Sequence, residues 1–342
     1  MRRISLFTIL FLSVALFGSA CIRKVTVAEV LPVQGQLSTE ELIARIDSYG
    51  RVDTFSAQAG VLVRNYFTGK ENKAEEFPEA NGAIRFRRPE NIRMLVTAPI
   101  VNTKVADMVS DGESFRLAIY YPKDKRQFVH GSNLGDLDRM TTDELNKAKD
   151  PRLAEAGGLI NMRPQHVTNA FLIKPTPTSG RADVFREEVL IEEPDDRPGK
   201  KGRKVVRGYY VVYVLERGEK GEAELRRKFW FDRTRQGTPL VRQQTFENGA
   251  GRLAGDVTYS KWFKAQNSSS ELPGRVIIDR RNDGYRLDLR LEPETVEVNA
   301  ELPMTTFVLE NNENLEEINL DAPRKATTDP PRRPLDPKPA NR

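Results

Sequence analysis

The residues with reactive side chains are few and lie far apart in this sequence. The 342 residues include one cysteine, Cys21, and two histidines, His130 and His166. We find no nucleophile elbow, no metalloprotease helix motif, no phosphate-binding glycine loop and no cysteine or histidine pair at metal-ligand spacing. Each histidine is more typical of a surface or helix-capping residue than of a catalyst. We therefore expect no enzyme activity, no cofactor and no metal.

The segment before Cys21 is typical of a secretory signal. Two arginines precede an almost wholly apolar stretch at 4–17, and the small residues at 18–20 lead directly into the cysteine. The apolar stretch has about 14 residues, which is too short for a helix that must span a hydrocarbon core of ~30 Å. Residues 1–20 are therefore interpreted as a signal that is removed.

The residues around the cysteine resemble the lipobox of bacterial lipoproteins. Ser19 and Ala20 fit this motif, whereas Gly18 stands where an aliphatic residue is usual. The resemblance implies a diacylglyceryl thioether on Cys21, and the alternative is ordinary cleavage after Ala20 with a free thiol. Ile22 is not the aspartate that retains lipoproteins at the inner membrane in some bacteria. We expect an exported chain, anchored by lipid to the periplasmic face of the outer membrane.

The positive net charge of +5 comes from the two ends of the chain. The two arginines of the signal contribute +2 and residues 321–342 contribute +3, so residues 21–320 are neutral. A nucleic-acid-binding domain would need a basic stripe on its folded part, and none is present. Residues 321–342 are basic and rich in proline with few apolar residues, and we expect this tail to be disordered.

Between these ends the sequence predicts one domain at 38–320, preceded by a tether at 21–37. Its first helix begins at Ser38, where Glu41 completes a capping box, and it continues to about Tyr49. A second short helix begins at the proline of 164–172, and it is a candidate lid. The segment 137–161 is polar with a weak helical rhythm.

The rest of the domain is predicted to be strands separated by turns. The Asp111-Gly112 pair, flanked by alternating apolar residues, predicts a hairpin. Residues 209–215 are apolar on both faces, which indicates apolar cover on each side of that strand. The predicted strands lie near 61–67, 84–87, 92–96, 104–110, 115–121, 184–193, 205–216, 224–232, 240–247, 253–263, 274–281 and 285–293, with a last segment at 296–309. The fold class is mainly β with a few short helices, as a strongly curved antiparallel sheet or incomplete β-barrel with a helical lid.

Four local patterns, taken in their order along the chain, resemble the LolA/LolB family of lipoprotein carriers and receptors. They are the first helix leading into a strand, the run 82–96 with its proline break, the turn at 110–112 followed by an aromatic strand, and 296–299 with Phe307 beyond. The resemblance covers 38–320. It implies an incomplete barrel, lidded by helices, whose hydrophobic cavity takes up the acyl chains of lipoproteins.

The family resemblance also implies roles for individual residues. LolB-like receptors carry an exposed aliphatic residue just after a proline in a turn between strands, and this residue helps to deliver cargo into the membrane. Ile100 matches it here with Val101 beside it, and the alternative is that both continue a buried strand. Expected lipid-cavity residues are Ile84, Phe86, Met94, Val96, Leu117 and Ile119.

The function predicted from these features is that of a lipid-anchored, periplasm-facing protein that binds lipoprotein acyl chains or other lipids. It would act in lipoprotein sorting to the outer membrane, with a soluble periplasmic carrier as a partner. One alternative is an envelope sensor or regulatory lipoprotein of the same fold. Another is a structural lipoprotein that binds a protein partner and carries no lipid. If Cys21 is unmodified, a soluble LolA-like carrier becomes the better interpretation.

Overall fold

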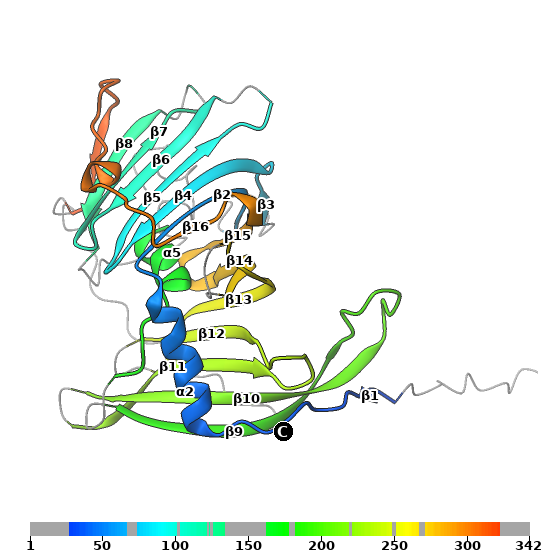
Figure 1. Ribbon diagram of the computed structural model, residues 1–342. Helices are drawn as coiled ribbons and strands as arrows, with labels where there is room; N and C mark the ends of the chain where they lie inside the picture. Colours follow the sequence, from blue (N-terminus) through cyan, green and yellow to red (C-terminus); the bar gives the residue numbers. More distant parts are fainter. Residues whose placement is uncertain are drawn as a thin grey trace, which may run out of the picture.

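The computed structural model of the chain is shown in Figure 1. Several predicted features lie outside the residues that it describes: the signal, Cys21, Val101, the polar segment 137–161 and the tail beyond Asp321. The described residues are 27–66, 74–100, 103–121, 123, 126–133, 162–177, 182–218, 221–247, 251–266 and 271–321.

A single curved sheet of 17 strands makes up most of the described structure (Figure 1). Sequential strands pair antiparallel, and the two end strands do not pair with each other among the described residues, so the barrel is open. Three short strands add to the sheet beside longer ones: β1 (Glu29–Val30) pairs with β10, and β3 (Glu75–Glu76) and β16 (Glu297–Val298) pair with β2. From one edge of the sheet to the other, the remaining strands follow in the order β9 (Ala182–Pro194), β10 (Lys204–Arg217), β11 (Ala223–Asp232), β12 (Leu240–Phe246), β13 (Leu253–Lys264), β14 (Glu271–Arg280), β15 (Tyr285–Leu291), β2 (Thr54–Asn65), β4 (Ala80–Arg87), β5 (Asn91–Thr97), β6 (Lys104–Ser110), β7 (Ser114–Ile119), β8 (Gln127–Ser132) and β17 (Glu317–Asn319). The predicted fold class is confirmed.

The first helix, α2 (Thr39–Ser48), begins where its capping residues predicted. Ser38 Oγ accepts a hydrogen bond from the backbone N–H of Glu41 at 3.1 Å, and Glu41 Oε2 accepts one from the backbone N–H of Ser38 at 2.7 Å. This reciprocal pair satisfies two N–H groups that a helix start otherwise leaves without partners. Leu42 and Ile46 are fully buried on the side that faces the sheet. A 3-10 turn, η1 (Tyr49–Arg51), then leads into β2.

The second helix, α5 (Pro164–Phe171), lies in the hollow of the curved sheet (Figure 1). The Phe171 ring lies 5.0 Å from the Phe86 ring and 5.8 Å from the Phe55 ring, measured between centroids. His166 Nδ1 is 2.5 Å from the hydroxyl of Tyr285, which is fully buried in β15. The helix is thus part of the core, and the contact between His166 and Tyr285 holds it against the sheet.

β10 is covered on both faces, as its sequence predicted. Tyr210, Val212 and Val214 point into the main core on the concave face. On the opposite face, Tyr209 is covered by an edge-to-face contact with Trp230 of β11 at 5.8 Å. The cover on that face is therefore made by neighbouring aromatic side chains of the sheet itself rather than by a helix.

The prediction of a last strand segment at 296–309 is largely wrong. Only β16 pairs with β2, because Asn299 then takes a left-handed φ of 56° and Pro303 follows soon after. The chain leaves the sheet and crosses the convex face of β6–β8, where Leu309 and Leu315 pack with Phe128. It ends as β17 beside β8.

Replacement of Phe86 by alanine should destabilise the fold strongly, because its ring is fully buried between Phe55 and Phe171. We expect the free energy of unfolding in urea to fall by about 3–5 kcal/mol. The matched control is Phe185→Ala on the edge strand β9, where the ring is 49% exposed and stacks on Tyr213 alone. That change should cost about 1 kcal/mol. Equal losses for the two variants would contradict the placement of the core.

Candidate functional site

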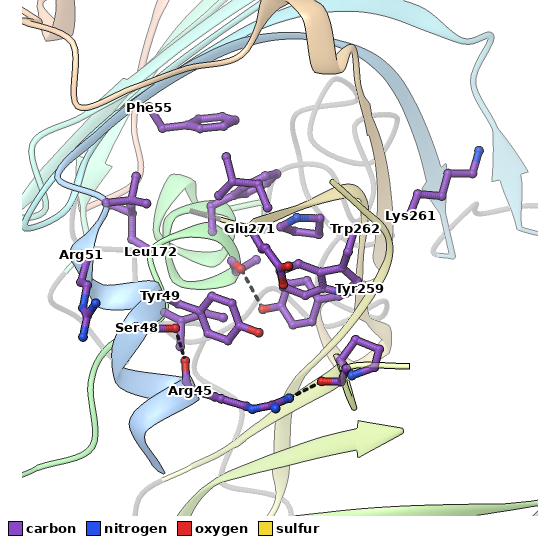
Figure 2. Close-up of a pocket in the computed structure, with 18 of the residues that line it drawn as sticks. Arg45, Ser48, Tyr49, Arg51, Phe55, Leu172, Tyr259, Lys261, Trp262 and Glu271 are labelled. Atoms are coloured by element: carbon purple, nitrogen blue, oxygen red, sulfur yellow. Dashed lines mark hydrogen bonds between the residues drawn. The ribbon is translucent and has the colours of Figure 1, made fainter. Parts of the chain in front are cut away.

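A cavity of about 670 Å³ opens beside the end of α2 (Figure 2). Four stretches far apart in the sequence enclose it: the end of α2 with η1 and the start of β2, residues 170–173 at the end of α5, the β11–β12 turn, and the paired strands β13 and β14. Its volume lies within the range of roughly 300–1,000 Å³ that is usual for small-molecule sites.

The walls of this cavity are mainly apolar and aromatic. Trp262 lies between two tyrosines, with its ring 5.4 Å from that of Tyr49 and 6.0 Å from that of Tyr259. The aliphatic and remaining aromatic wall is formed by Val52, Phe55, Phe171, Leu172, Leu272 and Pro273. Phe55 and Phe171 also contact Phe86, so the cavity borders directly on the main core.

The polar atoms of the cavity walls are largely engaged by the protein. The Tyr259 hydroxyl donates to the carbonyl oxygen of Ala170 at 2.8 Å, and Trp262 Nε1 donates to the carbonyl oxygen of Leu240 at 2.9 Å. Burial raises the pKa of Tyr259 well above its ordinary value, and it raises the pKa of Tyr49 with a smaller contribution from Glu271. Both phenols stay protonated at neutral pH, so these walls offer no phenolate nucleophile.

The cationic side chains lie at the margin of the cavity. Arg45 donates to the carbonyl oxygens of Gly237 and Thr238, and this contact ties α2 to the β11–β12 turn. In Figure 2, Arg51 and Lys261 point away from the space between the aromatic rings. Glu271 also lines the cavity, and its carboxylate contributes to the raised pKa of Tyr49. The aromatic and aliphatic walls suit the apolar part of a ligand, and the charged lining residues suit a polar end.

The ladder register places the six predicted cavity residues on one face of the sheet. Cross-strand pairs such as Ile84 with Met94 run from β4 to β7, and all six share the face against which α5 packs. Ile84, Phe86 and Met94 are buried in the core, whereas Val96, Leu117 and Ile119 are half-buried. None of the six lines the cavity beside α2, and no lining residue of that cavity was predicted from the sequence as a site residue.

Ile100 lies in the turn between β5 and β6, directly after Pro99, and its side chain is 95% exposed. β5 ends at Thr97, so the alternative that Ile100 continues a buried strand is wrong. The side chain of Ile100 is therefore directed away from the core of the described structure.

Neither α2 nor any other helix in the described part of the chain is long and apolar enough to span a membrane. Within the same residues, no group of three or more histidine, cysteine, aspartate or glutamate side chains could hold a metal ion.

No protein-family model matches this sequence, and no curated protein matches it either. Among solved structures, a LolA superfamily protein from Nitrosomonas europaea is 12% identical, with a TM-score of 0.40 over 80% of this chain and 99% of that one. A DUF1329 family protein from Desulfovibrio piger is 12% identical, with a TM-score of 0.42 over 79% of this chain and 95% of that one. A putative outer membrane lipoprotein-sorting protein domain from Vibrio parahaemolyticus is 7% identical, with a TM-score of 0.38 over 81% and 98% of the two chains.

These structural neighbours include the family that the sequence motifs resemble. At TM-scores of this size, they identify no ligand or partner for this chain.

Replacement of Tyr259 by phenylalanine should loosen the cavity wall, because the carbonyl of Ala170 loses its buried donor. We expect a loss of about 1–3 kcal/mol in the free energy of unfolding, measured in urea. Tyr49→Phe is the matched control in the same cavity, since the Tyr49 hydroxyl makes no hydrogen bond within the described residues. It should cost less than about 0.5 kcal/mol. A Tyr259→Phe variant as stable as this control would refute the role of the hydroxyl.

Proposed function

We propose that this chain binds an acyl chain of a lipid or lipoprotein in the cavity beside α2. The observation that carries the proposal is the composition of that cavity. Aromatic and aliphatic side chains form most of its lining, its phenols are neutral, and Arg51 and Lys261 point away from the space between the rings, whereas Glu271 lies near Tyr49. These properties suit a ligand with a long apolar part.

The physical basis is the cost of leaving hydrocarbon in water. Each CH₂ group of an acyl chain gains about 0.8 kcal/mol on transfer from water to an apolar site. A protein that carries such a chain needs a dry pocket rather than reactive groups. The contacts of Trp262 with two tyrosine rings provide flat apolar walls for this purpose.

In the cell, the chain would act as an exported lipoprotein, held by Cys21 at the periplasmic face of the outer membrane. There it would accept lipoproteins from a soluble periplasmic carrier and pass them to the membrane. The exposed Ile100 supports a delivery role, because an aliphatic side chain at a turn tip can enter the bilayer surface without disturbing the sheet. The half-buried Val96, Leu117 and Ile119 offer a second apolar surface on the concave face.

Acyl-chain binding can be tested through Trp262, which lines the cavity, after Trp230 on the other face of the sheet is replaced by phenylalanine. A dibrominated fatty acid should quench the fluorescence of Trp262 with a saturable dependence on concentration. Ser48→Phe should weaken this binding at least about tenfold, because Ser48 lines the cavity and a phenyl ring there would occupy part of it.

The matched control is Ser260→Phe, which places the same ring on β13 at a residue that does not line the cavity. Its binding of the brominated fatty acid should be unchanged. Quenching that does not saturate, or that both variants reduce equally, would count against the cavity as the acyl-chain site.

Replacement of Ile100 by glutamate tests delivery separately from binding. Because Ile100 is exposed in a turn, the stability should change by no more than about 0.5 kcal/mol. Acyl-chain binding should persist, whereas transfer of a bound lipoprotein to vesicles should slow about tenfold or more. Ile100→Leu, which keeps an aliphatic side chain, is the control and should transfer normally. Normal transfer by Ile100→Glu would exclude Ile100 as the delivery residue.

A further inference from the structure

The turn between β9 and β10 forms a basic tip at the end of the longest hairpin of the sheet (Figure 1). Residues 195–204 contain five basic and two acidic side chains. Gly199 and Gly202 take left-handed φ values of 75° and 81°, and both glycines have open space around them. The backbone N–H of Asp195 donates to the carbonyl of Arg203 at 2.9 Å, which closes the turn.

The acidic side chains of this turn are already paired with arginines. Arg197 holds Asp195 at 2.8 Å and Glu29 of β1 at 2.6 Å, and its hydrogen bonds lower the pKa of Asp195 to about 2. Asp196 is paired with Arg207 at 2.6 Å and also with Arg235.

Three cations remain unpaired at the tip. Lys200, Lys201 and Arg203 make no ion pair with another residue in the described part of the chain. Residues 195–204 carry a net charge of +3, and the carboxylates of Glu29 and Glu192 lie beside them in ion pairs with Arg197 and Lys204.

The N-terminal strand leaves the domain at this same hairpin. β1 runs parallel to β10, the N–H of Leu31 donates to the carbonyl of Val206, and Glu29 is held by Arg197. Only five residues separate Cys21 from Val27, so a lipid on Cys21 could lie no further than roughly 20 Å from the start of the described chain. Two of those five residues are basic, Arg23 and Lys24.

Exposed aliphatic side chains lie beside the basic tip. Val30 is 66% exposed next to Val206, and Leu190 is 64% exposed across the ladder from Gly208. Val33 lies near the same glycine. Glu188 and Glu192 lie on the same face of β9 as Leu190 and are paired with Arg233 and Lys204. Aliphatic side chains beside exposed cations suit a surface that lies in the headgroup region of an anionic bilayer.

We infer that the β9–β10 turn, with Lys200, Lys201 and Arg203, docks on the anionic headgroups of the bilayer that holds the lipid anchor. The inference rests on the proposed lipid at Cys21 only for the distance to the membrane, since the charge and the aliphatic patch belong to the domain itself. Docking fixes how the domain sits on the membrane, whereas the anchor alone would leave it free to turn.

A nitroxide label at Pro198→Cys tests this inference, because Pro198 is an exposed residue of the turn that carries no charge. The chain is reconstituted into vesicles of phosphatidylglycerol and phosphatidylethanolamine, and mass spectrometry establishes whether Cys21 carries lipid. We expect the label to collide with lipid-soluble oxygen and to be shielded from a water-soluble nickel chelate. A label at Glu113→Cys, in the β6–β7 turn, should stay accessible to the chelate.

Reversal of the three charges with Lys200→Glu, Lys201→Glu and Arg203→Glu should make the label at 198 accessible to the water-soluble nickel chelate. Each basic residue near an anionic surface strengthens binding about fivefold, so the equilibrium constant for docking should fall by more than about a hundredfold. About 1 M NaCl, where the Debye length is about 3 Å, or vesicles of phosphatidylcholine should have a similar effect. Reversal of three exposed lysines elsewhere, Lys104, Lys123 and Lys264, is the control and should leave the label docked.

A label at 198 that stays in water on the anionic vesicles would overturn the inference when Cys21 carries lipid. If mass spectrometry finds Cys21 unmodified, the proposed lipid anchor is wrong. The docking inference is then tested by adding the same vesicles to the processed chain, where contact of the label at 198 with lipid supports docking and its absence overturns it. A triple reversal that leaves vesicle contact unchanged but abolishes binding of an acidic protein would also overturn it, in favour of a protein partner.

Discussion

An open sheet that curves through so many strands has an apolar concave face that its own strands cannot cover, and the rest of this structure depends on how that face is buried. Strand twist accumulates across the sheet and turns this face inward. α5 fills part of the hollow through Phe171, and α2 covers another part through Leu42 and Ile46. Where the two helices and the β13–β14 pair do not meet, the cavity lined by Trp262 remains. The cavity thus results from the incomplete burial of the concave face.

Much of this fold can be predicted from the sequence, because many of its determinants are local. The capping box at Ser38, the turn at Gly112 and the alternation along β15 each depend on residues a few positions apart. The short strands β8 and β17 were not predicted. β17 reaches β8 only because the chain before it crosses the convex face. The local sequence of 296–309 gives no signal that the chain leaves the sheet at Asn299.

The candidate site was harder to predict than the fold. The family resemblance directed attention to β4–β7, and the register does place those residues together on the concave face. The cavity itself is assembled from four stretches between residues 45 and 273, and its aromatic residues are ordinary core residues in sequence. They are distinguished only by their contacts in the folded chain, where the ring of Trp262 lies close to the rings of Tyr49 and Tyr259.

We expect a folded, purified chain to hold an acyl chain in this cavity, and lipid extraction can detect and quantify that chain. The chain is purified from the exporting cell in mild detergent, denatured and extracted, and the acyl chains that are not covalently attached are quantified by mass spectrometry. The account predicts close to one bound acyl lipid for each wild-type chain. It predicts much less for a folded variant in which Leu172, part of the cavity wall, is replaced by arginine. Wild-type chain that is folded but free of such lipid, or equal lipid in both proteins, would contradict the account.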